Sequence, residues 1–179
     1  MKKNLGSLLA LYPTPATLVG AMVDGKPNWM QVAHVGIIGH DRIMISCMSN
    51  HYTNKGIRET GVVSVSLCDR AMLPELDRAG AGSGAKTDKS ELLAWTPAEN
   101  GAPVPEKAPL TLVCHVVDTY ETENFDNFVL AIDATLVEED KLDDAGKPDY
   151  GKISPVLFEF PTYSYYATGE KIGKCLSFK

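Results

Sequence analysis

The chain has 179 residues, of which 44% are apolar and 22% are charged, proportions that fit a globular domain and exclude a disordered one. Its formal net charge of −6, without any dense run of Lys and Arg, makes nucleic acid and anionic membrane surfaces poor candidates as partners. No apolar run approaches the ~20 residues of a membrane-spanning helix, and we expect the N-terminal stretch to be mature sequence. This length predicts one domain over residues 1–179.

The first half of the chain is rich in strand signals. Residues 16–23 are mostly β-formers and are followed by Asp24-Gly25, a favoured pair for a hairpin turn. Residues 52–60 predict a short helix that ends at Gly61, because glycine tolerates the left-handed conformation found after a helix. Further strands are predicted over residues 29–35, 43–48 and 62–67.

The second half alternates between irregular segments and strands. Residues 72–79 and 90–95 predict short helices, whereas residues 96–109 contain four prolines without periodicity and predict a surface loop. Strands are predicted over residues 110–120, 127–138, 156–160 and 163–167. The first two of these are expected to form an antiparallel pair. Many strands and few helices favour a mainly β fold, a barrel or a sandwich, over a βαβ sheet.

A cluster of small polar and weakly basic side chains lies where the predicted strand 43–48 meets the predicted helix. Its members are Ser49, Asn50, His51, Tyr52 and Thr53. The start of a helix has free N–H groups and a positive dipole end, so it can bind an anion such as a phosphate, and Thr53 would add a hydroxyl donor. The alternative is that Thr53 or Asn50 only caps its own helix, which is the commoner role of such residues.

A second candidate for ligand binding is the glycine-rich stretch 79–89, AGAGSGAKTDK. Its glycines let the backbone approach a ligand closely, and Ser83 and Lys89 could bind anionic oxygens. The stretch lacks the spacing of a P-loop, and it follows a helix rather than a strand, which excludes a dinucleotide fingerprint. The alternative is a linker of small residues.

The four cysteines and the four histidines lack metal-ligand spacing, so neither structural zinc nor another metal site is expected. The histidines are His34, His40, His51 and His115. All the cysteines are expected to be buried, reduced thiols, which suits the cytoplasm. They are Cys47, Cys68, Cys114 and Cys175.

Aromatic residues gather in the last predicted strand, where Tyr163 and Tyr165 share a face that a second subunit or a planar ligand could cover.

Several segments, taken in their order and spacing, resemble the flavin reductase-like family of FMN-binding split barrels, which contains flavoredoxin and NAD(P)H:flavin oxidoreductases. The resemblance covers roughly residues 10–175. No single segment is specific by itself. The segments are YPTPATLV (12–19), NWMQVA (28–33), HYTNKGIRETG (51–61), VVSVSL (62–67), SGAKTDK (83–89) and LVCH (112–115).

The resemblance implies a split β-barrel of the antiparallel Greek-key type that binds FMN. It implies that the end of strand 43–48 and the following helix bind the FMN phosphate, that strand 31–33 lies along the isoalloxazine, and that the segment 83–89 closes over the phosphate or ribityl end. Cys47 and Met48 would form walls of the site. The full set of cofactor-binding candidates is Gln31, Val32, Ala33, His34, Cys47, Met48, Ser49, Asn50, His51, Thr53, Ser83, Gly84 and Lys89.

Three residues depart from the family pattern. His51 stands where many relatives have arginine, so a fixed cation is replaced by a group that titrates near neutrality. His34 stands where tryptophan is common, and Ser90 replaces a usual phenylalanine. These departures would alter flavin affinity or the redox partner rather than the family assignment.

The resemblance implies an oxidoreductase that transfers a hydride from NAD(P)H to the flavin and on to an acceptor, with the flavin at a homodimer interface. No catalytic residue is identified. The alternative is a flavoredoxin-type electron carrier, or a flavin-binding module, that lacks its own NAD(P)H site and uses a redox protein as partner. A third alternative is a split barrel that binds another planar group, haem or pyridoxal phosphate.

Overall fold

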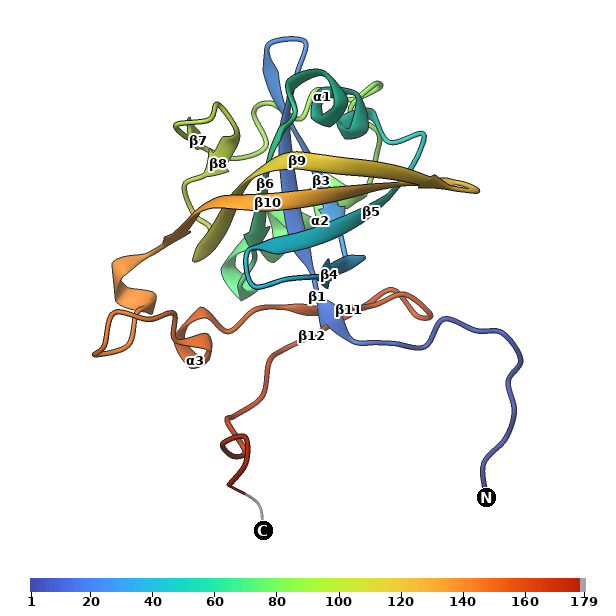
Figure 1. Cartoon of the computed structure of the whole chain (residues 1–179), viewed down its shortest axis with the longest axis vertical. Helices are drawn as coiled ribbons and strands as arrows, with labels where there is room; N and C mark the ends of the chain where they lie inside the picture. Colours follow the sequence, from blue (N-terminus) through green and yellow to red (C-terminus); the bar gives the residue numbers. More distant parts are fainter. Residues whose placement is uncertain (178–179) are drawn as a thin grey trace.

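The computed structural model describes residues 1–177 and is built around a curled antiparallel sheet (Figure 1). The order of its strands is β3-β2-β6-β9-β10-β5-β4, and β9 and β10 form a long hairpin across the molecule. The strands are β2 (Thr17–Val23), β3 (Lys26–Val32), β4 (Val35–Ile37), β5 (Arg42–Met48), β6 (Val62–Leu67), β9 (Leu110–Thr122) and β10 (Phe125–Val137). The expected mainly β barrel and the expected antiparallel pair are confirmed.

Two smaller sheets flank the main one. The first is formed by β1 (Thr14–Pro15), β11 (Leu157–Glu159) and β12 (Ser164–Tyr166), and it lies below the barrel in Figure 1, on the side from which the two terminal segments extend. The second is a short hairpin of β7 (Trp95–Pro97) and β8 (Pro103–Pro105). The first sheet brings the C-terminal aromatic residues back to the start of the chain.

The helices are short and cover the ends and one side of the barrel. α1 (Tyr52–Thr60) packs on β2 near the top of Figure 1 and ends as expected at Gly61, whose φ is 68°. α2 (Leu73–Gly80), which follows the 3₁₀ turn η1 (Arg70–Met72), packs on β3. The remaining helical segments are the 3₁₀ turn η2 (Glu139–Lys141) and the short helix α3 (Tyr150–Ile153). None of the helices within residues 1–177 is both long enough and apolar enough to cross a membrane.

Two apolar clusters hold these layers together. Inside the barrel, Ile57 of α1 packs with Ile45, Val63 and Phe128, all nearly or fully buried. Burying one such side chain contributes roughly 1.5–3 kcal/mol. Outside the barrel, Trp29 packs in a second cluster with α2 and with the C-terminal strand β11. The two clusters therefore fix α1 and α2 on either side of β3.

Four expectations need correction. Residues 90–95 do not form a helix: the backbone N–H of Ser90 donates to Asp88 Oδ1 at 2.9 Å, so the chain turns there. Residues 96–109 are not a plain surface loop, because they contain most of the β7–β8 hairpin and bury Ala102 fully. The predicted strand 29–35 is instead β3, which ends at Val32, followed by the separate strand β4. Cys175 is exposed, whereas the other three cysteines are buried, and all four thiols are free.

Candidate functional site

The turn between β5 and α1 is fixed by the backbone. His51 occupies the N-cap position of α1 in an extended conformation, and its N–H donates to the carbonyl of Met48 at 3.0 Å. The N–H of Ser49 donates to Asn124, in the β9–β10 turn, at 2.9 Å. No side chain caps the helix, so the expected alternative role of Thr53 or Asn50 as a cap is not observed. The first N–H groups of a helix have no partner within it, and for Tyr52 and Thr53 no backbone hydrogen bond is found among residues 1–177.

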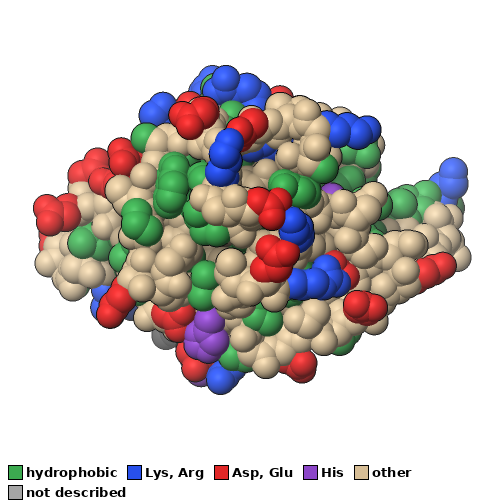
Figure 2. Space-filling model, turned by 90° about the horizontal axis from the view of Figure 1, so that it is seen from above, with side chains coloured by type: hydrophobic (Ala, Val, Ile, Leu, Met, Phe, Trp, Pro, Cys, Tyr) green, Lys and Arg blue, Asp and Glu red, His purple; other side chains and the backbone are tan. Residues whose placement is uncertain are grey.

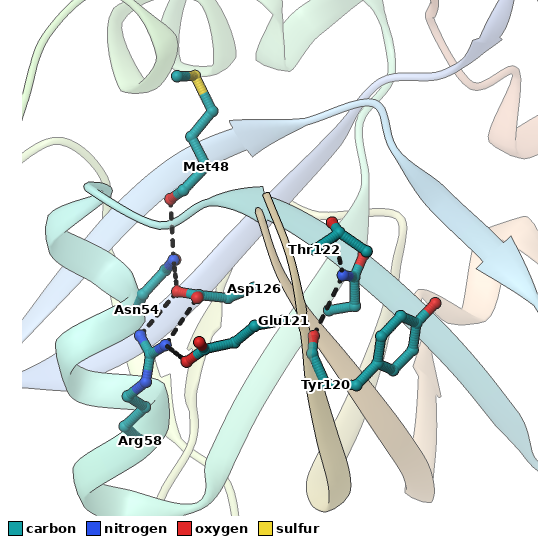
Figure 3. A network of polar contacts seen from close by, with 8 residues as sticks. Met48, Asn54, Arg58, Tyr120, Glu121, Thr122 and Asp126 are labelled. Atoms are coloured by element: carbon teal, nitrogen blue, oxygen red, sulfur yellow. Dashed lines mark hydrogen bonds and ion pairs between the residues drawn. The ribbon is translucent and has the colours of Figure 1, made fainter. Parts of the chain in front are cut away.

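A buried carboxylate ties α1 to the barrel (Figure 3). Asp126 of β10 is 1% exposed in its side chain, and it accepts hydrogen bonds from Asn54 at 2.6 Å and from Arg58 at 2.7 Å. Asn54 also donates to the carbonyl of Met48 at 2.9 Å, and Arg58 lies 3.5 Å from Glu121. The hydrogen bond from Arg58 holds the pKa of Asp126 below its ordinary value. This network positions the start of α1 relative to the end of β5.

A cavity of about 460 Å³ opens at the start of α1. It lies between α1, β3 and the glycine-rich segment after α2, and the end of β5 closes one side. On its inner wall Thr53 is 2% exposed, and its Oγ1 accepts a hydrogen bond from Asn28 Nδ2 at 2.7 Å. Because Thr53 Oγ1 is an acceptor in this bond, its own hydrogen is available to a ligand. The lining also includes Asn50, Ser83 and Lys86, so the cavity has several hydrogen-bond donors.

The glycine-rich segment forms a compact turn over this cavity. The N–H groups of Lys86 and Thr87 both donate to the carbonyl of Ser83, at 3.0 and 3.1 Å. A Cβ on Gly84 would lie 2.7 Å from Tyr52 Cδ1 and would also overlap Asn28, so only glycine fits there. The turn therefore packs closely against Tyr52 and Asn28 and forms one wall of the cavity.

A second cavity of about 340 Å³ adjoins the first and shares Gln31, His51 and Gly80 with it. Its other walls are mainly aromatic: Phe158, Phe160, Tyr163 and Tyr165. The hydroxyl of Tyr165 lies 2.9 Å from both Gln31 Oε1 and Asp77 Oδ1. Burial, aided by Asp77, raises the pKa of Tyr165 to about 12, so this hydroxyl stays protonated at neutral pH. One cavity thus offers polar donors, and its neighbour offers aromatic surface.

The two histidines of the candidate set differ in their surroundings. His34 Nε2 lies 3.0 Å from the hydroxyl of Tyr12, and its ring stacks on Phe160 with 5.4 Å between centroids. His51 Nδ1 is buried without a hydrogen-bond partner within residues 1–177, although the residue lines both cavities. Burial lowers the pKa of both imidazoles, and the charge of Lys89 lowers that of His51 further, against the opposite effect of Asp126.

We expect these lowered pKa values to make the protein less stable in mild acid. Unfolded imidazole titrates near pH 6.5, so between that value and the lower folded pKa the unfolded chain binds more protons. The thermal midpoint should therefore fall as the pH is lowered from about 7 to about 5, and less so in the double variant His34→Gln, His51→Gln. Equal losses in the two proteins, measured by thermal denaturation at each pH, would contradict this assignment.

The structure brings most of the predicted site residues together. The larger cavity is lined by Gln31, Met48, Asn50, His51, Thr53, Ser83, Gly84 and Lys89. Ala33 lines the second cavity, and His34 borders its aromatic wall. Val32 and Cys47 point their side chains into the barrel core instead, so Cys47 does not form a side-chain wall. Ser49 is exposed in the turn and does not line either cavity.

Sequence reasoning missed several wall residues. Lys86 lies within the glycine-rich stretch and lines the cavity, but it was not singled out as a candidate. Asn28 lies in the segment 28–33, which also carries the resemblance, and its hydrogen bond to Thr53 Oγ1 holds the Thr53 side chain in place. Phe158 and Phe160 come from a predicted strand, and only the pairing of β11 with β1 places them beside β3. No local signal in the sequence marks these two aromatic residues as part of the site.

The curled antiparallel sheet is the fold of split-barrel flavin proteins among the solved structures. The chain belongs to the flavin reductase like domain family, whose model matches residues 9–166. It is 31% identical over 144 residues to an uncharacterized protein of Archaeoglobus fulgidus, covering 78% of this chain and 80% of that one.

Solved structures agree with this family. Flavoredoxin from Methanosarcina acetivorans is 35% identical, with a TM-score of 0.94 over 99% of this chain and 96% of that one. Flavoredoxin of Desulfovibrio vulgaris (Miyazaki F) is also 35% identical, with a TM-score of 0.91 over 99% and 98% of the two chains. An FMN-binding protein from Thermus thermophilus shares the fold at 19% identity, with a TM-score of 0.82 over 97% and 98%.

Proposed function

We propose that the protein binds FMN across the two adjoining cavities as an oxidoreductase of a single domain over residues 1–179. The phosphate would lie in the donor-rich cavity at the start of α1, and the isoalloxazine would extend towards the aromatic cavity. The observation that carries this proposal is the junction of the two cavities at Gln31 and His51. A ligand with an anionic end and a planar end matches this pair of environments.

The residues of this chain fit such a cofactor. The free N–H groups of Tyr52 and Thr53, together with the Thr53 hydroxyl, suit an anion. The Nδ1 atom of His51, buried without a partner within the described residues, suits a polar edge of the ring or the ribityl chain. Asn50, Ser83 and Gly84 would complete the polar wall, and Met48 and Ala33 would complete the apolar one. The side chains of Val32, Cys47 and Ser49 line neither cavity. These residues would contribute only through their backbone, which positions the lining residues next to them in the sequence.

When bound, FMN would supply the hydride chemistry, and NAD(P)H is the proposed co-substrate that donates the hydride. The chain's own residues would bind and orient. Tyr165 holds the side chain of Gln31 in place at the junction, and a neutral His51 would contact the cofactor without adding a charge. We assign no general acid or base, because hydride transfer to a flavin does not demand one.

A flavoredoxin-type electron carrier is the second candidate, favoured by the two flavoredoxins at 35% identity. Such a protein would lack its own NAD(P)H site and would accept electrons from a protein partner. The two candidates differ when NADH or NADPH is mixed anaerobically with the FMN-loaded protein. Rapid bleaching of the flavin supports the reductase, whereas flavin that stays oxidised with both nucleotides contradicts it and supports the carrier.

We further propose that the protein is a cytoplasmic homodimer. Free thiols at all four cysteines agree with a reducing compartment. Large apolar side chains are exposed on the N-terminal segment and beside the aromatic cavity, and burying them against a second copy would remove them from water. They include Leu5, Leu8, Leu9, Leu11, Tyr163 and Tyr166. Sedimentation of the purified protein tests the dimer, and a monomer at micromolar concentration would contradict it.

Replacing Thr53 with valine should weaken FMN binding about tenfold, because the variant loses a donor and leaves Asn28 Nδ2 without its acceptor. Valine has nearly the same shape, so the fold should be retained. Quenching of flavin fluorescence measures the affinity, and Thr135→Val, at an exposed position of β10, is the matched control. An unchanged affinity in Thr53→Val would contradict the placement of the phosphate.

A further inference from the structure

A cation would strengthen the binding of the proposed phosphate at the helix start, and most cations near the cavity already have partners. Lys26 pairs with Asp88 at 2.9 Å, and Lys55 pairs with Asp24 at 2.7 Å. Arg58 pairs with the buried Asp126. On the face seen in Figure 2, basic and acidic side chains are interspersed. Each of these three cations therefore already has an acidic partner in the structure.

Lys89, which the sequence predicts as a ligand of anionic oxygens, is also occupied. The residue is 6% exposed, and its ammonium donates to the carbonyls of Ala79 at 2.5 Å, Gly82 at 2.5 Å and Trp29 at 3.3 Å. An ammonium group has three hydrogens, so these acceptors use all of them. Burial lowers the pKa of Lys89, while the three carbonyls favour its charged form. Lys89 thus joins the end of α2 and the glycine-rich turn to β3.

Lys86 has the opposite character. It lines the cavity, and its side chain has no acidic partner among residues 1–177. The turn that begins at Ser83 holds its backbone, because Ser83 accepts hydrogen bonds from the N–H groups of Lys86 and Thr87 through its carbonyl, and from Ala85 through its hydroxyl. A flexible, unpaired ammonium on an ordered turn can reach an anion at the cavity mouth.

We propose that the two lysines divide the work: Lys86 binds the phosphate directly, and Lys89 is a positioning residue that gives the glycine-rich turn its shape. This inference rests on the proposed FMN site. It requires that replacing Lys86 weakens the binding of only those ligands that carry the phosphate. It also requires that replacing Lys89 weakens the binding of every flavin, because a displaced turn distorts the whole cavity.

The test compares FMN with riboflavin, which lacks the phosphate, by quenching of flavin fluorescence. Lys86→Met should weaken FMN binding about tenfold and leave riboflavin affinity and the thermal midpoint unchanged, whereas Lys86→Arg should retain FMN affinity. Lys89→Met should lower the thermal midpoint without flavin and weaken both ligands by similar factors. Lys147→Met, in the exposed loop before α3, is the matched control.

The outcomes separate this inference from the proposed function. If the unchanged protein binds neither flavin, both fail before any variant is made. If it binds FMN but Lys86→Met keeps that affinity, or Lys89→Met loses FMN selectively over riboflavin, the division of roles is wrong and the FMN site stands. Should Lys89→Met not fold, Gly84→Ala disturbs the same turn from its other side and should weaken both flavins together.

Discussion

Replacing Gly56 with alanine is expected to lower the free energy of unfolding by about 3 kcal/mol and to weaken FMN binding strongly. In an exposed helix the same change would stabilise the protein by roughly 0.5–1 kcal/mol, so the expected sign is reversed. The reason is that α1 packs directly on β2 at this residue. A Cβ on Gly56 would lie 2.9 Å from the carbonyl carbon of Met22 and closer still to its oxygen, and both are backbone atoms that cannot rotate away.

The helix would have to move away from the barrel, and the free N–H groups at its start would move with it. Thermal denaturation should show a midpoint lower by roughly 10 °C for a chain of this size. Gly39→Ala is the control, because a Cβ there makes only ordinary contacts of 3.5 Å or more. A Gly56→Ala protein as stable as the control would show that α1 does not lie where the structure has it.

Replacing Asp126 with alanine is the second large effect, with an expected loss of about 3 kcal/mol. Asn54 and Arg58 would both lose their acceptor (Figure 3). This loss of stability is at the lower end of the range for broken buried ion pairs. The Arg58 side chain is 42% exposed, so water can solvate its charge once Asp126 is removed. Asn54 also holds the end of β5 through Met48, so FMN affinity should fall together with stability.

The pH dependence distinguishes this network from a simple packing defect. An unfolded aspartate titrates near pH 3.9, and Arg58 keeps the pKa of folded Asp126 below its ordinary value. The carboxylate therefore stabilises the fold above about pH 4, and this contribution disappears as the pH falls through the folded pKa. The stability gap between the unchanged protein and Asp126→Ala should narrow in acid, with the exposed Asp144→Ala as control. A gap that stays constant down to about pH 2 would contradict the ionic role.

The sequence was most informative where the signal was local. The bounds of α1 and β6 were predicted to the residue, because Gly61 ends the helix and apolar and hydroxyl residues alternate after it. The segments 90–95 and 96–109 were misread, because contacts distant in sequence decide them. The side chain of Lys89 is drawn inward by carbonyls of β3 and α2, and Ala102 is buried against a strand of the main sheet.

The sequence predicted the location of the candidate site better than the roles of its residues. Thr53 and Ser83 line the cavity as expected from a helix start and a glycine-rich turn. Strand alternation could have separated Gln31 and Ala33, which face the cavities, from Val32, which faces the core. The roles of Lys86 and Lys89 could not be distinguished from sequence, because only the folded backbone shows which ammonium meets three carbonyls.

The most direct test of the FMN site is a titration of the purified, flavin-free protein with FMN, followed by visible absorbance and flavin fluorescence. The proposal predicts saturable binding of one FMN per chain, with a shifted absorbance band and quenched fluorescence, and a weaker curve for Thr53→Val. If the spectrum and the fluorescence of FMN stay those of the free cofactor in excess protein, the two cavities do not form a flavin site, and the proposed function is contradicted.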